Sequence, residues 1–300
     1  MTAQPNRTRP RGFAPWNPRP DTLALVRAVQ AVLAEYQTHL PLTIRQVFYR
    51  LVATQGYDKT EAAYARLGET IGRARRSGLI PFASIRDDGA ARHETQTWAD
   101  PAGFLANVQA AAKGFRLDRQ DGQPARLWIL CEAGGMAPML ARVANLYGVP
   151  VLTSGGFDSL TAKYELAREL TQALRTPPGW AEVLHLGDLD PSGEHLFTSL
   201  AEDVGAMARE LCGAEPQFTR LAVTREQAER LGLPTAPPKQ TDRRSFTGQT
   251  VQCEAIAPDV LSDILRDAIE ARRDPEATDD VLRREADMRA DLLEKLKDMA

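Results

Sequence analysis

The sequence predicts an α/β protein in which a helical first part precedes a mostly parallel sheet. Short apolar runs near residues 127–131, 149–153, 182–187 and 217–223 alternate with helix-period stretches near 136–147, 159–174 and 194–211. Strand–helix–strand alternation of this kind favours a parallel sheet with helices on its faces. The runs are continuously apolar, which is typical of strands that are buried on both sides.

The part before the sheet is predicted to be a helical domain over residues 21–120. Asp21, Thr43 and Thr60 each precede a helix-period stretch and are expected to cap its first turn. An extended segment from Phe82 to Trp98 follows the third of these helices. Three helices followed by an extended segment are similar to a winged helix.

Charge is distributed unevenly along a chain of ordinary composition. Residues up to Trp98 hold 14 basic and 8 acidic side chains, which leaves 23 basic and 32 acidic ones in the rest. A basic N-terminal part and an acidic C-terminal part suit a DNA-binding domain joined to a metal-binding domain. Residues 1–20 hold four arginines, five prolines and no acid, and are predicted to form a disordered basic arm. Such an arm either lies along the phosphates of DNA or is a disordered tail that binds nothing.

Eight further arginines are candidates for contacts with double-stranded DNA, because guanidinium groups bind the phosphates that position a protein on a duplex. Four lie on the third predicted helix, two on the extended segment and two in a proline-rich loop. They are Arg66, Arg73, Arg75, Arg76, Arg86, Arg92, Arg243 and Arg244. Exposed arginines are also common on helices that bind nothing, so a solvated helix face is the alternative interpretation.

Three acidic residues follow two of the predicted strands. Glu132 closes the first run, and Asp188 and Asp190 follow the third. Because ligands of open α/β sheets sit at the carboxyl ends of strands, these carboxylates are expected to gather at one edge. Carboxylate oxygens suit Mg²⁺, and a cation would relieve their mutual repulsion. The alternative is that such acids cap the helices that follow.

Tyr49 lies on the second predicted helix, in the sequence Arg45-Gln46-Val47-Phe48-Tyr49. A tyrosine on an amphipathic helix is usually a packed aromatic residue with a solvated hydroxyl group. A phenol also has an ordinary pKa near 10, so it needs activation before it can act as a nucleophile. Arg45 lies on the same helical face and could supply a positive charge for that purpose.

These segments resemble the A subunit of topoisomerase VI and the related meiotic double-strand-break transesterase. In that family an arginine, two residues and an aromatic pair ending in the nucleophile precede a Toprim domain. A Toprim domain has a glutamate after one strand and Asp-x-Asp after a later one. Here Arg45-x-x-Phe48-Tyr49, Glu132 and the run Gly187–Gly193 carry the resemblance, which covers about residues 40–255. The chain also looks like compact stand-alone relatives from bacteria and mobile elements.

The resemblance implies a CAP-like winged-helix domain over 21–120, a Rossmann-like Toprim domain over 121–275 and a C-terminal helix over 276–300. It implies that Mg²⁺ is held by Glu132, Asp188 and Asp190, and that catalysis uses Tyr49, Arg45 and Glu132. The implied activity is cleavage of duplex DNA through a 5′-phosphotyrosyl link. The implied assembly is a homodimer in which Tyr49 of one chain meets the acids of the other. Such enzymes also work with a separate ATPase B-type subunit, and this chain has no P-loop pattern of its own.

One departure from the family keeps two other functions open. Many members carry a lysine directly after the glutamate, where this chain has Ala133. The alternatives are a Toprim nuclease that activates water while Tyr49 is merely packed, and an inert DNA-binding module. No apolar run approaches the roughly 18 residues of a membrane span. The chain is therefore expected to be cytoplasmic, associated with the nucleoid, and without a membrane partner.

Overall fold

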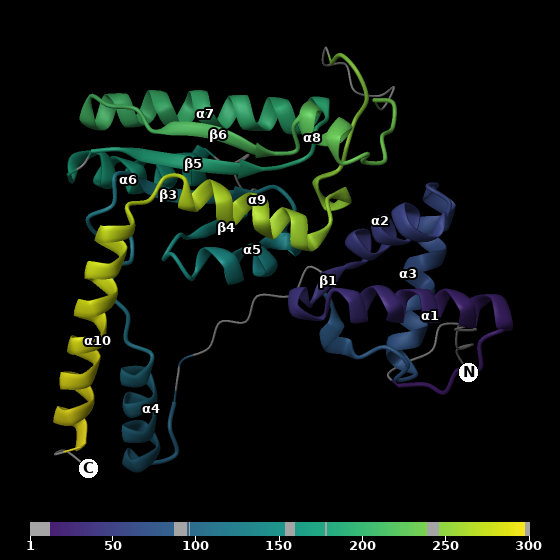
Figure 1. The fold of residues 1–300 in the computed structure, drawn as a ribbon, viewed down its shortest axis with the longest axis horizontal. Coiled ribbons are helices and arrows are strands. Elements are labelled where there is room, and N and C mark those ends of the chain that lie inside the picture. Colours follow the sequence, from purple (N-terminus) through teal and green to yellow (C-terminus); the bar gives the residue numbers. More distant parts are fainter. Residues whose placement is uncertain are drawn as a thin grey trace, which may run out of the picture.

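The computed structural model describes residues 13–86, 95, 97–153, 160–177, 179–238 and 246–297. This part of the chain forms a parallel sheet flanked by helices, a group of N-terminal helices and a long C-terminal helix (Figure 1). The α/β class predicted from the sequence is therefore confirmed. None of the helices described is both long and apolar enough to cross a lipid bilayer.

The main sheet has four strands in the order β4-β3-β5-β6, and each neighbouring pair runs in parallel. Its strands are β3 (Arg126–Cys131), β4 (Val151–Thr153), β5 (Ala181–Leu186) and β6 (Gln217–Ala222). Cys131, the last residue of β3, lies opposite Leu186, the last residue of β5. The residues that directly follow these two central strands therefore emerge together at one edge of the sheet.

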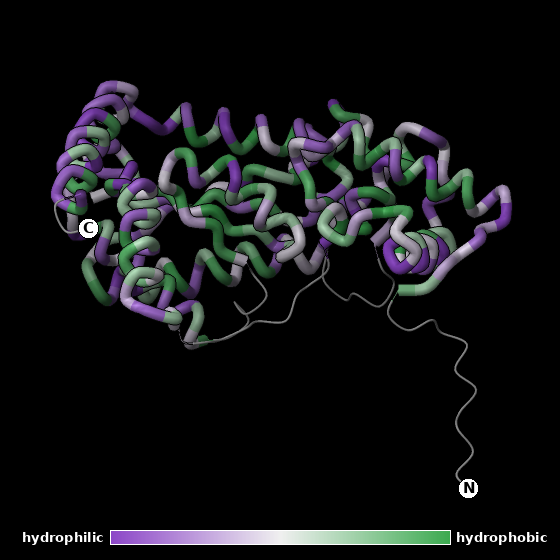
Figure 2. The backbone as a smooth tube through the Cα atoms, turned by 90° about the horizontal axis from the view of Figure 1, so that it is seen from below, coloured by the Kyte–Doolittle hydropathy of each residue, from purple (hydrophilic) through white to green (hydrophobic). Residues whose placement is uncertain are grey.

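Helices cover both faces of the sheet, as its continuously apolar strands require. Trp128, Leu130 and Val183 pack in one cluster with two helices, α6 (Leu160–Arg175) and α7 (Pro191–Cys212). The alternate residues Ile129 and Leu184 pack in another cluster with α5 (Ala137–Ala144) and α9 (Pro258–Glu270). Figure 2 shows the most hydrophobic stretches along the central strands, between these two helical layers.

The N-terminal helices pack on one another beside the sheet; they are α1 (Pro20–Glu35), α2 (Ile44–Gln55) and α3 (Glu61–Arg76). Thr43 caps α2 in a capping box with Gln46, and Thr60 caps α3, so these two predictions are confirmed. The prediction for Asp21 is wrong. Helix α1 begins at Pro20 with Arg19 as its N-cap, because proline is favoured at the first helical position.

The segment after α3 begins with a short turn, η2 (Phe82–Ser84), and a strand, β2 (Ile85–Arg86). Strand β2 pairs in parallel with β1 (Leu42–Thr43). The rest of the predicted extended segment, including Arg92, lies mostly outside the described residues. Helix α4 (Pro101–Lys113) packs against α10 (Pro275–Lys297), far from α1–α3 (Figure 1). The structure thus groups the last part of the predicted 21–120 domain with the C-terminal helix.

The remaining elements are short and connect the larger ones; they are η1 (Gln37–His39), η3 (Gly134–Met136), α8 (Arg225–Arg230) and η4 (Cys253–Ala255). Two of them join the helical group to the sheet, because η3 contacts β1 and η4 contacts α2. A Cβ atom built on Gly135 would overlap the methyl group of Thr43. Glycine at this position therefore permits the close approach of η3 to the residue that caps α2.

Replacing Gly135 with alanine is expected to destabilise the fold by about 1–3 kcal/mol, because the added methyl group overpacks this junction. Gly72→Ala is the matched control. No atom lies within 4 Å of a Cβ built on Gly72, which is inside α3. That change is expected to be neutral or to stabilise the fold by up to about 1 kcal/mol. Denaturant unfolding measures both effects, and equal stability of the two variants would contradict the tight junction.

Candidate active site at the strand ends

Glu132 and Asp188 lie together at the carboxyl edge of the sheet because β3 and β5 are neighbours. The backbone N–H of Asp188 donates a hydrogen bond to Glu132 Oε2 at 2.9 Å. Burial and the charge of Asp188 raise the pKa of Glu132 to about 7. Burial also raises the pKa of Asp188. Burial and neighbouring acids thus hinder the ionisation of both half-buried carboxylates, so a cation would be stabilised at this place.

Asp190 has a different position from the other two acids. Its Oδ1 accepts hydrogen bonds of 2.7 Å from the Ser192 hydroxyl and from the Gly193 backbone N–H, so it caps α7. Its charge nevertheless contributes to the raised pKa of Glu132. Among the described residues, no three His, Cys, Asp or Glu side chains are arranged as a metal-binding group. The carboxylate pair still fits Mg²⁺, which keeps several waters and commonly uses one or two carboxylates.

Asp188 and Asp190 lie in the turn between β5 and α7, which we call the acidic turn. Arg220, on the neighbouring strand β6, donates hydrogen bonds to the backbone in and beside this turn. Its guanidinium donates to the carbonyl oxygens of Gly187 and Val223 at 3.2 Å, and also to that of Asp188. Its positive charge lowers the pKa of both Glu132 and Asp188, in opposition to burial. Arg220 was not among the residues selected from the sequence. The available signal was a charged residue within an apolar run that was predicted to be buried.

Four consecutive residues, Gln252–Ala255, connect the acidic turn to helix α2; we call them the connector. The Cys253 N–H donates to Asp188 Oδ1 at 2.8 Å. Glu254 accepts a 2.5 Å hydrogen bond from the Thr43 hydroxyl. Just before the connector, Val251 and Leu189 exchange backbone hydrogen bonds of 2.8 and 2.9 Å. The connector is thus attached to the acids on one side and to the start of α2 on the other.

Arg45 and Arg50 of α2 also bind the connector. Arg45 Nη1 donates to Gln252 Oε1 at 2.8 Å, and Arg45 Nε lies 3.4 Å from Glu254 Oε2. Arg50 donates to the Ala255 carbonyl oxygen. The side chain of Arg45 remains 45% exposed, so its remaining donors can reach a ligand outside the protein. Arg45 therefore forms an ion pair with a buried acid of the connector, Glu254.

Tyr49 lies on α2 in the electrostatic field of these groups. Its side chain is mostly buried, and its ring packs edge-on against Phe48 at 5.4 Å between centroids. Burial raises the pKa of Tyr49 to about 12; Arg45 opposes this shift, while Asp188 and Glu254 add to it. Tyr49 is therefore close enough to the acids of its own chain for their charge to affect its ionisation. Activation requires either a cation at the acids or proton removal during attack.

Lys59 is a second cation near Tyr49, and it too was not among the residues selected from the sequence. Its Nζ lies 5.9 Å from the centroid of the Tyr49 ring and donates to the Thr235 carbonyl oxygen at 2.6 Å. Burial lowers the pKa of Lys59. The loop between α2 and α3 is thereby attached to the segment that follows α8, next to the tyrosine.

The arginines predicted to bind DNA occupy different environments. Arg66 and Arg86 are exposed, and Arg73 forms a 2.7 Å ion pair with Glu69. Arg75 contributes to the fold, because it donates to the carbonyl oxygens of Phe82 and Ile85 and its guanidinium lies 4.7 Å from the Phe82 ring centroid. The remaining candidates are Arg76, which is half-buried on α3, and Arg92, Arg243 and Arg244, which lie outside the described residues.

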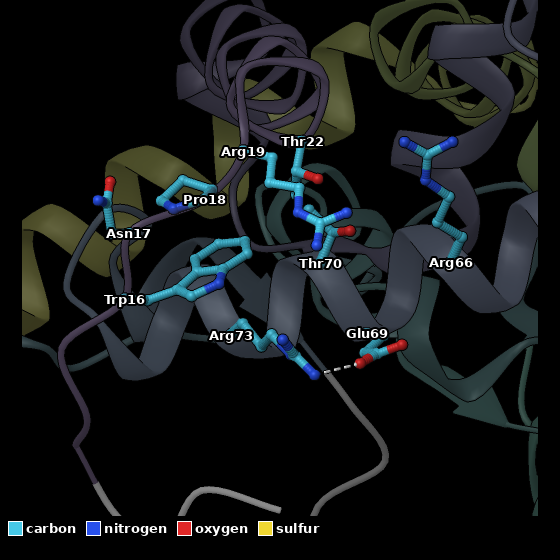
Figure 3. Close-up of a pocket in the computed structure, with 9 residues that line it drawn as sticks. All are labelled: Trp16, Asn17, Pro18, Arg19, Thr22, Arg66, Glu69, Thr70 and Arg73. Carbon is cyan, nitrogen blue, oxygen red and sulfur yellow. Dashed lines mark ion pairs between the residues drawn. The ribbon is translucent and has the colours of Figure 1, made fainter.

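A pocket of about 410 Å³ separates the start of α1 from α3 (Figure 3). Trp16 and Arg19 line it from the segment before α1, and Arg66, Thr70 and Arg73 face them from α3. Within the described part, neither Arg19 nor Arg66 has an ion pair or a side-chain hydrogen bond. Three guanidinium groups against the single carboxylate of Glu69 make this concave surface suited to a phosphate group.

The raised pKa of Glu132 predicts that cation binding depends on pH near neutrality. The folded-state pKa of about 7 lies above the ordinary carboxyl value, so ionised Glu132 destabilises the metal-free fold. Protonated Glu132 makes its full contribution to the free energy of unfolding when the pH is below the ordinary carboxyl pKa. This contribution is lost as the pH rises through about 7. Mg²⁺ competes with this proton, so its affinity is expected to fall by up to about tenfold per pH unit below 7.

Melting temperatures with and without Mg²⁺ at pH 6 and pH 8 measure this effect. The rise produced by Mg²⁺ is expected to be larger at pH 8. Glu132→Gln removes the titrating group and is expected to remove most of the difference between the two pH values. A Mg²⁺ effect that is the same at both pH values in the unaltered protein would contradict the assignment.

Comparison with known proteins identifies no relative of this chain: no family model, no curated protein and no solved structure matches it.

Proposed function

We propose that this chain is a Mg²⁺-dependent DNA transesterase of the topoisomerase VI A-subunit type, with a winged-helix-like and a Toprim-like part. The observation that carries the proposal is the position of Tyr49 beside Arg45, within the electrostatic influence of Asp188. A nucleophile, a cation for the phosphate and a pair of carboxylates at one place are the groups that phosphoryl transfer requires.

In the proposed reaction, Tyr49 Oη attacks a backbone phosphorus atom and the bond from phosphorus to the 3′ oxygen breaks. The phenol proton passes to water and the departing 3′ oxygen takes a proton, which leaves a 5′-phosphotyrosyl link and a free 3′ hydroxyl group. Arg45 holds the phosphate and opposes the raised pKa of the phenol. Glu132 has a pKa of about 7 without a bound cation, so it would be ionised when it holds Mg²⁺ and would act in catalysis through that ion. Mg²⁺ bound by Glu132 and Asp188, beside Asp190, would neutralise charge on the phosphate and the leaving oxygen.

The proposed substrate is double-stranded DNA, and the proposed working unit is a homodimer, because cutting both strands requires two tyrosines. By the same resemblance, a separate B-type subunit would supply any coupling to ATP, and the enzyme would work at the nucleoid. Incubation with supercoiled DNA and Mg²⁺, followed by detergent with or without protease, tests the activity. Protein-linked ends support the proposal, and DNA that remains intact at every Mg²⁺ concentration contradicts it.

A water-using nuclease is the second candidate, and two observations favour it. The pKa of Tyr49 is about 12, which keeps the free phenol protonated, and the half-buried Glu132 and Asp188 lie where a cation that activates water would be held. In this case the carboxylates would activate water and Tyr49 would only pack. The same detergent experiment would then yield free ends that migrate identically before and after protease treatment.

We propose that the pocket between α1 and α3 binds phosphates of the DNA backbone. Arg19→Ala together with Arg66→Ala is expected to weaken binding to duplexes of any sequence. The log–log salt slope is expected to fall by about 0.9 for each phosphate that the variant no longer binds. Arg283→Ala is the matched control, because Arg283 is exposed on α10 and pairs within that helix with Asp280. Fluorescence anisotropy over a salt series measures both; an unchanged slope in the double variant would place the DNA surface elsewhere.

A further inference from the structure

The pocket between α1 and α3 has room for more than a phosphate group. Its volume of about 410 Å³ lies within the range of pockets that enclose a small organic ligand. Its lining combines the indole ring of Trp16 with the exposed side chains of Arg19 and Arg66. Phosphate binding alone accounts for the arginines, but it gives no role to an aromatic ring in the same wall.

The wall that carries Trp16 is attached to α3 and to the turn that follows it. The Ala14 N–H donates a 3.0 Å hydrogen bond to the carbonyl oxygen of Arg76, the last residue of α3. The Phe13 ring packs edge-on against Phe82, with 5.6 Å between the ring centroids. Trp16 itself is half-buried and packs against the hydrophobic core. The fold therefore places the indole at the pocket in advance, so a ligand would bind it with little further loss of side-chain freedom.

The lining suits an aromatic base that is joined to a phosphate. Figure 3 shows the Trp16 ring extending toward the space between Arg19 and Arg73. Arg73 pairs with Glu69 at 2.7 Å, so three guanidinium groups face one carboxylate and the pocket keeps a positive charge. Proteins that bind single strands combine these groups, because a base stacks on an aromatic ring while basic side chains hold the backbone. A base inside a duplex is already stacked and paired, so only an unpaired nucleotide can enter such a pocket.

We propose that this pocket receives one unpaired nucleotide of a DNA strand, with its base stacked on Trp16 and its phosphate held by Arg19 and Arg66. This inference rests on the proposed function, because it takes DNA as the substrate and the pocket as a phosphate site. It adds the kind of DNA that the protein selects. DNA in which base pairing is interrupted is bound more tightly than a uniform duplex, whose phosphates still reach the arginines.

Three DNA molecules of equal length and charge test the base separately from the phosphate. The first is fully paired, the second has a central bubble of mismatched pairs, and the third has abasic sites in both strands of that bubble. Fluorescence anisotropy without Mg²⁺ measures the affinities, so the result does not depend on cleavage. The bubble is expected to bind on the order of tenfold more tightly than the paired duplex, and the abasic bubble is expected to lose most of this preference.

Substitution of Trp16 tests whether its ring carries the preference. Trp16→Leu is expected to reduce the preference for the bubble to less than about threefold, while Trp16→Phe keeps an aromatic ring and retains most of it. Trp180→Leu is the matched control, because Trp180 is 52% exposed and lies directly before β5, outside the pocket lining. Melting temperatures show whether each variant is folded. The abasic bubble decides the question with the unaltered protein even if Trp16→Leu does not fold.

Equal affinity for the paired duplex and the bubble would overturn this inference, and so would a preference that survives both the abasic sites and Trp16→Leu. Competition with thymidine monophosphate distinguishes a free nucleotide from a nucleotide of a strand. If the monophosphate competes as well as a single-stranded trinucleotide, the pocket serves a free nucleotide and the inference is wrong. These results leave the transesterase proposal in place, because covalent linkage is measured in a separate experiment. A protein that prefers the bubble through Trp16 but forms no covalent link would contradict the proposed function alone.

Discussion

Tyr49→Phe is expected to abolish covalent attachment to DNA, by at least ~10³-fold, because the variant lacks the attacking oxygen. The phenyl ring keeps its place against Phe48, so folding stability is expected to change by less than about 1 kcal/mol. Affinity for duplex DNA is expected to stay within about threefold, since phosphate contacts supply most of it. Detergent-quenched cleavage assays and anisotropy measure the two quantities separately.

Tyr64→Phe is the matched control for this change. Tyr64 lies on α3, its ring packs against Phe48 at 5.3 Å, and Arg45 lies 5.9 Å from its ring centroid. The control therefore removes a phenol oxygen from the same aromatic cluster without removing the proposed nucleophile. Undiminished covalent linkage in Tyr49→Phe would contradict the proposed role of this tyrosine. Equal losses in both variants would indicate that the aromatic cluster matters only for packing.

Asp188→Asn is expected to reduce Mg²⁺-dependent cleavage by at least about 100-fold, because one of the two paired carboxylates loses its charge. The asparagine oxygen still accepts from the Cys253 N–H, so the turn and the connector keep their shape. The pKa of Asp188 is raised, which means that its ionised form destabilises the metal-free fold at neutral pH. Melting temperature without Mg²⁺ is therefore expected to stay the same or rise, while the stabilisation by Mg²⁺ falls.

Asp190→Asn is the informative comparison for Asp188→Asn. Asparagine is a good N-cap, so α7 is expected to begin normally. Mg²⁺ binding and cleavage are expected to weaken less than in Asp188→Asn, because Asp190 contributes charge near Glu132 while its Oδ1 accepts bonds from Ser192 and Gly193. Isothermal titration with Mg²⁺ and cleavage assays rank the variants; a larger effect at Asp190 would show that this acid is the main ligand.

Local sequence patterns predicted the sheet part well. Continuous apolar runs located the four strands, and their carboxyl ends located Glu132 and Asp188, because neighbouring parallel strands end at the same edge. Thr43 and Thr60 were recognised as caps because a side-chain oxygen before an amphipathic stretch is a local signal. Asp21 failed as a cap because Pro20 provides a competing start one residue earlier.

The relation between Tyr49 and the acids was not predictable from such patterns. It depends on the bond between Thr43 and Glu254, which are 211 residues apart, and on a connector that carries no recognisable motif. The role of Arg75 was also not predictable from the local sequence pattern. Its neighbour Ala74 is buried, so Arg75 sits at the edge of the packed face of α3, where only the tertiary fold decides that it stacks on Phe82.

Identification of the residue that carries DNA after cleavage tests the central claim most directly. The unaltered protein is incubated with a labelled duplex and Mg²⁺, quenched with detergent, and digested with nuclease and protease before mass spectrometry. We expect a nucleotide attached through its 5′ phosphate to the Tyr49 peptide, with a free hydroxyl group at the other DNA end. Cleaved DNA without any modified peptide, or with the modification on a residue other than Tyr49, would contradict the transesterase mechanism proposed for this chain.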